Sequence, residues 1–280
     1  MTETLLFSYP ITLLVLCPLI FLAAFVDSIA GGGGLISLPA YLFIGLPIHT
    51  AHGTNKFTAT TGLLTAVVNY IRGGCVDFPA AISGGIAALI GSFFGTYLAL
   101  SLSPYALQIS LMVILPLAGI IVFARQSVER LLQGRKKISS NEQTNVPINE
   151  IQKKLSFRQK MIVCCLIGLV FGCYDGFFGP GAGMFMTMGL SALAGLELVK
   201  ASGTARVVNF SSNIASTATW MINGRIYFPL TIPCMICAVT GAYLGSRMAM
   251  KVGKRLIKAI LVIVSFLLFV KILFDLINVR

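Results

Sequence analysis

The sequence has few charged residues. Asp, Glu, Lys and Arg together make up 11% of its 280 residues, against about 25% in soluble domains. Hydrophobic residues make up 56%, so the remaining polar residues cannot cover a surface that faces water. The composition excludes an ordinary soluble protein and predicts a chain that lies in a lipid bilayer.

Acidic residues are the scarcest charged group. Nine Asp and Glu stand against 21 Lys and Arg, which gives a net charge of +12. The basic residues gather between apolar segments, as is typical of loops on the cytoplasmic face, so the charge does not indicate a nucleic-acid partner. The stretch before the first apolar segment contains Glu3 and no Lys or Arg. This pattern argues against a secretory signal peptide.

Catalytic and metal-binding motifs are also missing. The sequence has no Walker motif, no GxSxG and no HExxH, which disfavours an ATP-driven pump or a membrane hydrolase. We therefore expect neither an enzyme nor a cofactor. Cys234 and Cys237 have redox spacing but no second pair. The six cysteines in apolar runs are interpreted as small packing residues; they are Cys17, Cys164, Cys165, Cys173, Cys234 and Cys237. His49 and His52 lack acidic or Cys partners, so we predict surface residues and no metal site.

The sequence contains two copies of one unit. "AFVDSIAGGGG" at 24–34 matches "GCYDGFFGPGA" at 172–182, which pairs Asp27 with Asp175. "GLPIHTAHGTNKF" at 45–57 matches "GLELVKASGTARV" at 195–207, which pairs Lys56 with Arg206. Internal repeats of this kind are typical of secondary transporters, whose site lies at the repeat interface.

Apolar segments recur in the same order in both copies. They are expected at 11–30, 35–46, 57–71, 80–100 and 105–124, and again at 160–178, 184–195, 207–222, 228–248 and 256–277. A spanning helix needs about 20 residues, so 35–46 and 184–195 are too short to span. We predict an all-α polytopic membrane protein with two inverted repeats, about eight full transmembrane helices, and two half-helices that follow glycine-rich loops.

The charge distribution predicts the orientation. Nine Lys or Arg lie between Arg125 and Lys160, which favours a cytoplasmic linker at 125–158 between repeats at 1–124 and 159–280. The same rule favours inverted repeats with both termini outside. A cytoplasmic N-terminus with eight plain spans is the alternative.

The two glycine loops are candidate anion sites. In lipid, irregular backbone survives only where protein buries it or where it lines a wet cavity. Each loop precedes a short helix whose first N–H groups are free and lie at the positive end of the dipole. The predicted substrate-binding backbone comprises Gly31, Gly32, Gly33, Gly34, Gly179, Gly181 and Gly183. Close helix packing through small residues is the alternative.

Ionisable residues flank both loops. Asp27 and Asp175 lie in spanning segments, where a carboxylate is costly and is often functional. Each is a candidate for proton coupling, and each is equally a candidate cap for the following turn.

A basic residue lies at the matching position of each copy. Lys56 and Arg206 are predicted to begin spanning helices, a position that disfavours a cation unless an anion lies nearby. An interfacial anchor is the alternative. The neighbouring polar residues complete the predicted substrate site; they are Thr54, Asn55, Thr204 and Asn209.

The paired segments "DSIAGGGGLISLPAYLFIGLPIHTAHGTNKF" and "DGFFGPGAGMFMTMGLSALAGLELVKASGTAR" resemble the sulfite exporter TauE/SafE family, also called the toluene sulfonate uptake permease family. Within it the chain is most similar to the branch of probable membrane transporters. The resemblance implies a multi-pass transporter of the bacterial inner membrane. It also implies small sulfur-containing or organic anions as substrates, moved with an ion gradient.

Two function classes follow. The first is a secondary transporter that works by alternating access, and the second is an anion channel of the same architecture without coupling. The expected partners are a small anionic substrate and the lipid bilayer, with a homo-oligomer left open.

Overall fold

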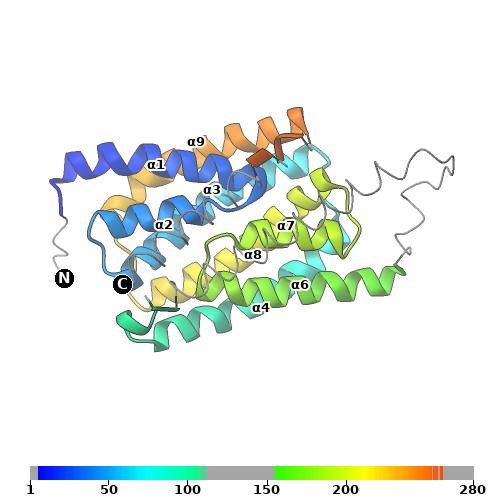
Figure 1. The fold of residues 1–280 in the computed structure, drawn as a ribbon, viewed down its shortest axis with the longest axis horizontal. Coiled ribbons are helices and arrows are strands. Elements are labelled where there is room, and N and C mark those ends of the chain that lie inside the picture. The colour runs from blue at the N-terminus through cyan, green and yellow to red at the C-terminus, as the bar shows by residue number, and fades with distance from the viewer. Residues whose placement is uncertain (1–5, 108, 111–154, 254, 258, 261–280) are drawn as a thin grey trace, which may run out of the picture.

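The computed structural model describes residues 6–107, 109–110, 155–253, 255–257 and 259–260, and eight helices are labelled within them (Figure 1). The first four are α1 at Tyr9–Ala30, α2 at Gly34–Phe43, α3 at Ile48–Arg72 and α4 at Phe78–Ser101. The second four are α6 at Phe157–Phe177, α7 at Ala182–Ala192, α8 at Leu198–Ile222 and α9 at Phe228–Val252. No strand occurs in this part of the chain, so the predicted all-α class is confirmed.

Helix length separates two kinds of element. α1, α4, α6 and α9 are long and apolar enough to cross a membrane. α2 and α7 have 10 and 11 residues and are too short to span. They coincide with the half-helices predicted at 35–46 and 184–195. Most of the segments predicted at 105–124 and 256–277, and nearly all of the linker at 125–158, lie outside the described residues.

α3 and α8 begin well before the predicted starts at residues 57 and 207. The opening turns of α3 carry the polar sequence "IHTAHGTN", yet the structure buries them against protein. Hydropathy alone therefore places the start too late. Lys56 and Arg206 lie about two turns inside their helices, so the prediction that each begins a helix is wrong.

The same early start buries the two histidines. His49 and His52 are 8% and 1% exposed, which contradicts the prediction of surface residues. Their rings lie 5.9 and 6.0 Å from the Trp220 ring of α8, centroid to centroid. They therefore form part of the packing between α3 and α8.

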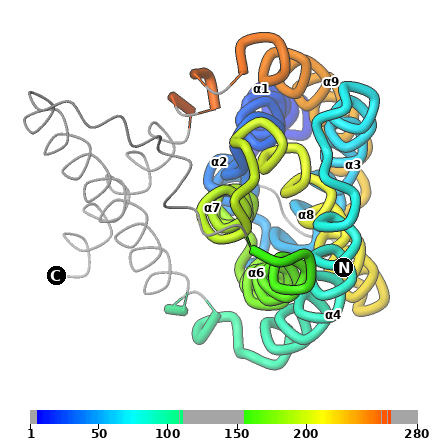
Figure 2. Tube along the Cα trace, turned by 90° about the vertical axis from the view of Figure 1, so that its right-hand side faces the viewer, coloured from blue at the N-terminus to red at the C-terminus, as the bar shows by residue number. Residues whose placement is uncertain are grey.

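The helices pack as two four-helix bundles. One bundle consists of α1, α2, α3 and α9, and the other consists of α6, α7, α8 and α4. Figure 2 shows α9 beside α1 and α4 beside α6. Each bundle therefore takes its fourth helix from the other half of the chain. α1 and α6, the first helices of the two copies, run in opposite directions in Figure 1.

Small residues allow these helices to lie close together. A Cβ atom at Gly241 of α9 would overlap the backbone of Phe21 in α1. A Cβ atom at Gly176 of α6 would overlap the backbone of Ser92 in α4. Backbone contact through small residues is the usual way in which membrane helices gain van der Waals packing.

The Gly-Thr pairs Gly53–Thr54 and Gly203–Thr204 hold α9 and α4, the helices that each bundle takes from the other half of the chain. The Thr54 hydroxyl accepts a hydrogen bond of 2.9 Å from the N–H of Tyr227, which precedes α9. The Thr204 hydroxyl accepts the matching bond of 3.0 Å from the N–H of Asp77, which precedes α4. The repeated motif thus performs the same structural task in each bundle.

Asp77 also caps α4 at the end of the bundle. Its carboxylate accepts from the N–H of Ala80 and pairs with Lys160 of α6, at 3.1 and 2.7 Å. Burial alone would raise the pKa of Asp77, but these hydrogen bonds and the Lys160 charge outweigh it and hold the pKa below its usual value.

Candidate binding site

The first chain break follows α1. Gly31 and Gly32 have φ of 77° and 131°, a backbone conformation that favours glycine because side chains clash there. The Asp27 carboxylate reaches across the break. Its Oδ1 atom accepts hydrogen bonds from the N–H groups of Gly32 and Gly33, at 2.9 and 3.0 Å. Asp27 therefore satisfies two donors of the first loop itself.

The second break follows α6 and is built differently. Gly179 and Gly181 have φ of 91° and 82° and flank Pro180, which has no N–H group. The hydroxyl of Tyr174 donates to the Pro180 carbonyl at 2.8 Å. The carboxylate of Asp175 accepts its hydrogen bonds from α8 and pairs with α3.

The two loops lie against each other. A Cβ atom at Gly31 would overlap the backbone of Gly183 and Met184. A Cβ atom at Gly34 would approach the Cα atom of Pro180 to 3.0 Å. The glycines of the two copies therefore meet where the two bundles join.

Two ion pairs cross between the bundles. The Lys56 ammonium lies 2.8 Å from Asp175 Oδ1, and the Arg206 guanidinium lies 3.7 Å from Asp27 Oδ2. Lys56 and Asp27 belong to the first copy, and Arg206 and Asp175 belong to the second. Each basic residue thus faces the acidic residue of the other copy.

The two basic side chains have different surroundings. Arg206 is fully buried. Its Nη1 donates to the Asp27 carbonyl at 2.6 Å, and its Nη2 donates to Gly183 O and Thr187 Oγ1 at 2.9 and 3.2 Å. The guanidinium therefore ties the two breaks together. Lys56 instead lines a cavity with its ammonium group close to Gly179.

Asp175 is the most fully satisfied carboxylate of the site. One oxygen pairs with Lys56, and the other accepts hydrogen bonds from the Ser212 hydroxyl at 2.5 Å and the Asn213 amide at 3.0 Å. Its side chain is 4% exposed, against 20% for Asp27. A buried carboxylate persists when a counter-ion and hydrogen bonds compensate for lost hydration.

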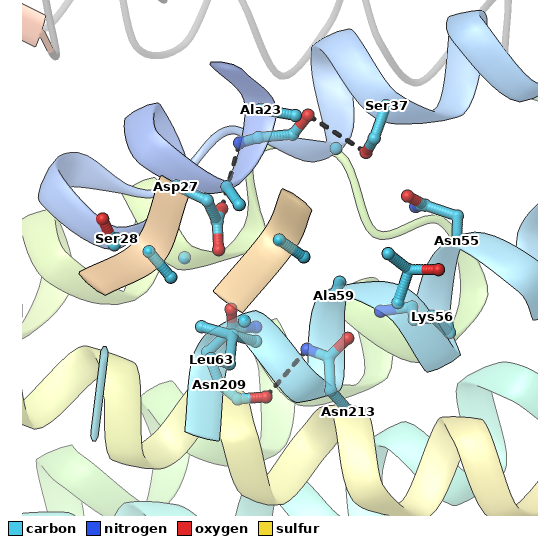
Figure 3. Close-up of a pocket in the computed structure, with 18 of the residues that line it drawn as sticks. Ala23, Asp27, Ser28, Ser37, Asn55, Lys56, Ala59, Leu63, Asn209 and Asn213 are labelled. Atoms are coloured by element: carbon cyan, nitrogen blue, oxygen red, sulfur yellow. Dashed lines mark hydrogen bonds between the residues drawn. The ribbon is translucent and has the colours of Figure 1, made fainter. Parts of the chain in front are cut away.

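A cavity of about 50 Å³ lies between the loops, α3 and α8 (Figure 3). The predicted site residues that line it are Asp27, Gly33, Gly34, Asn55, Lys56, Asp175, Gly179, Gly183 and Asn209. Those that do not line it are Gly31, Gly32, Thr54, Gly181, Thr204 and Arg206. The predicted set had omitted four polar lining residues, which are Ser28, Ser37, Thr58 and Asn213. Of these, Thr58 and Asn213 lie three and four residues after Asn55 and Asn209, a spacing that predicts one shared helix face in each copy.

The cavity contains side-chain donors that no group in the described residues accepts from. The side-chain amides of Asn55 and Asn209 line it without a hydrogen-bond partner in the described part of the chain. Figure 3 shows Asn55 near Lys56 and Asn209 near Asn213. Among the lining residues, Lys56 is the sole basic side chain. A space of this size admits water or a small ion.

Apolar helices long enough to span, two interrupted helices, and a cavity with charged and amide side chains where they meet are the features of a helical membrane transporter. Comparison with known proteins identifies its family. A model of the sulfite exporter TauE/SafE family matches residues 16–272, and the chain belongs to this family. The family predicted from the paired segments is thereby confirmed.

Curated relatives carry transporter names. A "Probable membrane transporter protein" of Haemophilus influenzae is 33% identical over 255 residues, which is 91% of this chain and 92% of the relative. The "Probable membrane transporter protein YfcA" of Escherichia coli K12 is 30% identical over 266 residues, covering 95% and 91%. YdhB of Bacillus subtilis is 24% identical over 230 residues, covering 82% and 86%. No solved structure matches the chain significantly.

Proposed function

We propose that this transporter is a secondary transporter of small anions, sulfur-containing or organic, across the bacterial inner membrane. Sulfite, sulfonates and carboxylates are the substrate class. One observation carries the proposal: Lys56 lines one buried cavity together with the side-chain amides of Asn55 and Asn209, which have no partner among the described residues. An ammonium and free N–H donors in a site shielded from water favour an anion, because charge-assisted hydrogen bonds are strong there.

The helix starts add to this preference. Gly34 and Gly183 line the cavity in the first turns of α2 and α7, where the dipoles of both helices are positive. The N–H groups of Gly32 and Gly33 already bind Asp27. The proposed anion therefore contacts Gly34, Gly183 and Lys56 rather than the whole of both loops.

The arrangement of the helices supports an inverted repeat and alternating access. α1 and α6 run in opposite directions (Figure 1), and the cavity lies where the two bundles meet. Each bundle is held together by close glycine contacts. In the proposed cycle the bundles rock against each other around the cavity, with the linker on the cytoplasmic side.

A ligand screen tests the proposal. The purified chain is unfolded thermally with sulfite, thiosulfate, methanesulfonate and acetate, alongside the Asn55→Ala, Asn209→Ala double variant. A ligand at 100 times its Kd adds about 2.7 kcal/mol of stability. We expect at least one anion to stabilise the wild type and to have less effect on the variant. If none of the four anions stabilises the wild type, the proposal is contradicted.

A flux assay distinguishes a coupled transporter from a channel with the same cavity. The carboxylates of Asp27 and Asp175 line the cavity beside Lys56, which favours coupling to an ion over free diffusion. Proteoliposomes with an imposed pH gradient should accumulate the anion above its external concentration. Equilibration without accumulation would identify a channel.

A further inference from the structure

Two acidic residues line the cavity at matching positions of the repeat, yet they make different contacts. Asp27 Oδ1 holds two backbone N–H groups of its own loop. Asp175 Oδ1 holds the Lys56 ammonium instead. The Lys56 ammonium, which the proposed substrate anion needs as its counter-ion, is therefore already paired with the Asp175 carboxylate.

We propose that Asp175 is the proton-coupling residue and that the substrate anion replaces its carboxylate as the counter-ion of Lys56. This inference rests on the proposed function and deepens it. Asp175 takes a proton from water on the side where the anion enters, and one of its carboxylate oxygens gains an O–H bond. Lys56 remains an ammonium throughout. The anion then occupies the position beside it.

Charge balance is the reason for the exchange. In the structure one ammonium and one carboxylate lie 2.8 Å apart with side chains 3% and 4% exposed. A second anion at the same ammonium would put two negative charges in a space shielded from water. Closely placed like charges do not both stay ionised in such a site. Binding of a monovalent anion with one proton keeps the site's charge unchanged.

The groups around Asp175 allow its neutral form. Ser212 and Asn213 stay in place when the carboxylate is protonated, and the Ser212 hydroxyl can accept as well as donate. Among described residues the charged groups near it are Lys56 of α3 and, across the cavity, Asp27 of α1. Arg206 of α8 is bound to the two breaks. α4 and α7 contain no charged residue, and the Tyr174 hydroxyl is bonded to Pro180.

The same comparison excludes Asp27 from this role. Its basic partner, Arg206, does not line the cavity, so an anion there cannot replace the Asp27 carboxylate as a counter-ion. The Oδ1 atom of Asp27 holds the two N–H groups of the first break. Asp27 is therefore a positioning residue for the loop. The two aspartates, although equivalent by repeat, have separate tasks.

Calorimetry of the full chain in detergent tests the exchange. Thiosulfate and methanesulfonate serve as probes because they do not themselves titrate near neutral pH. Heats measured in two amine buffers of different ionisation enthalpy give the protons taken up per anion. We expect the wild type to take up one proton with methanesulfonate at high pH. There its affinity should fall about tenfold per pH unit, because binding and protonation are linked.

Variants then assign the proton. Asp175→Asn should bind methanesulfonate without proton uptake and with an affinity independent of pH, whereas Asp27→Asn should retain uptake. The infrared difference spectrum of the wild type gives a second readout that needs no variant, because a protonated carboxyl band should appear on binding. Anion binding without uptake or without that band, or uptake that persists in Asp175→Asn, would overturn the inference alone. No binding of either probe would overturn the proposed function in its sulfur-anion form and the inference with it.

Discussion

Removing the charge of Lys56 should destabilise the fold through the carboxylate that it leaves behind. Lys56→Met keeps similar volume but strands Asp175, whose side chain is 4% exposed. Breaking one partner of a buried pair costs about 3–5 kcal/mol. Two hydrogen bonds to Asp175 survive, from Ser212 and Asn213. We therefore expect the lower end of the range, about 3 kcal/mol.

A double-mutant cycle measures this directly. Asp175→Asn removes the charge at nearly constant shape, and the double variant leaves neither charge uncompensated. The loss of unfolding free energy in the double variant should be about 2–3 kcal/mol smaller than the sum of the two single losses, measured by denaturant unfolding. The Asp77 and Lys160 pair, with side chains 18% and 24% exposed, is the matched control and should couple by less than about 1 kcal/mol. Additive single effects at Lys56 and Asp175 would show that the ion pair does not stabilise the fold.

Three further predictions concern the scaffold. Gly31→Ala should abolish folding or cost several times more stability than Gly74→Ala in thermal unfolding. Both glycines have positive φ, but only a Cβ atom at Gly31 would overlap other backbone. Equal costs would contradict the contact between the two loops. Thr54→Val and Thr204→Val should each lower the free energy of unfolding by about 1–3 kcal/mol, because each leaves a backbone N–H group without its acceptor. Serine at either position should restore this stability. An unchanged melting curve for the valine variants would argue against these hydrogen bonds holding α9 and α4. Asp77→Asn keeps the helix cap but loses the ion pair with Lys160, so it should cost up to about 1 kcal/mol at neutral pH. Because the folded pKa of Asp77 is lowered, this cost should vanish as the pH falls through that pKa. A cost that persists in acid unfolding curves would contradict that sign.

Local pattern was enough to find the two chain breaks. The expected half-helices at 35–46 and 184–195 lie within three residues of α2 and α7. Glycine next to a short apolar run determines such a break locally, so it can be read without knowledge of the fold. The copies could be aligned for the same reason.

The pairing of charges required the fold. Lys56 and Asp175 come from different copies and meet because the bundles lie against each other. The sequence marks Lys56 and Arg206 as equivalent, and nothing local indicates that Arg206 binds the two breaks while Lys56 lines the cavity. Thr54 is a second example, because its place close to Lys56 in the sequence predicts a substrate contact. Its hydroxyl instead binds a helix start more than 170 residues away.

The proposed function requires the cavity to bind the transported anion. Its most direct test is flux of labelled thiosulfate into proteoliposomes under an imposed pH gradient. Wild type is compared with the Asn55→Ala, Asn209→Ala double variant, which removes two amides that make no hydrogen bond in the described chain. Asn223→Ala, at the exposed end of α8, is the control. We expect uphill uptake by the wild type and the control, with flux lost in the double variant. Equal uptake by all three, or none by the wild type, would contradict it.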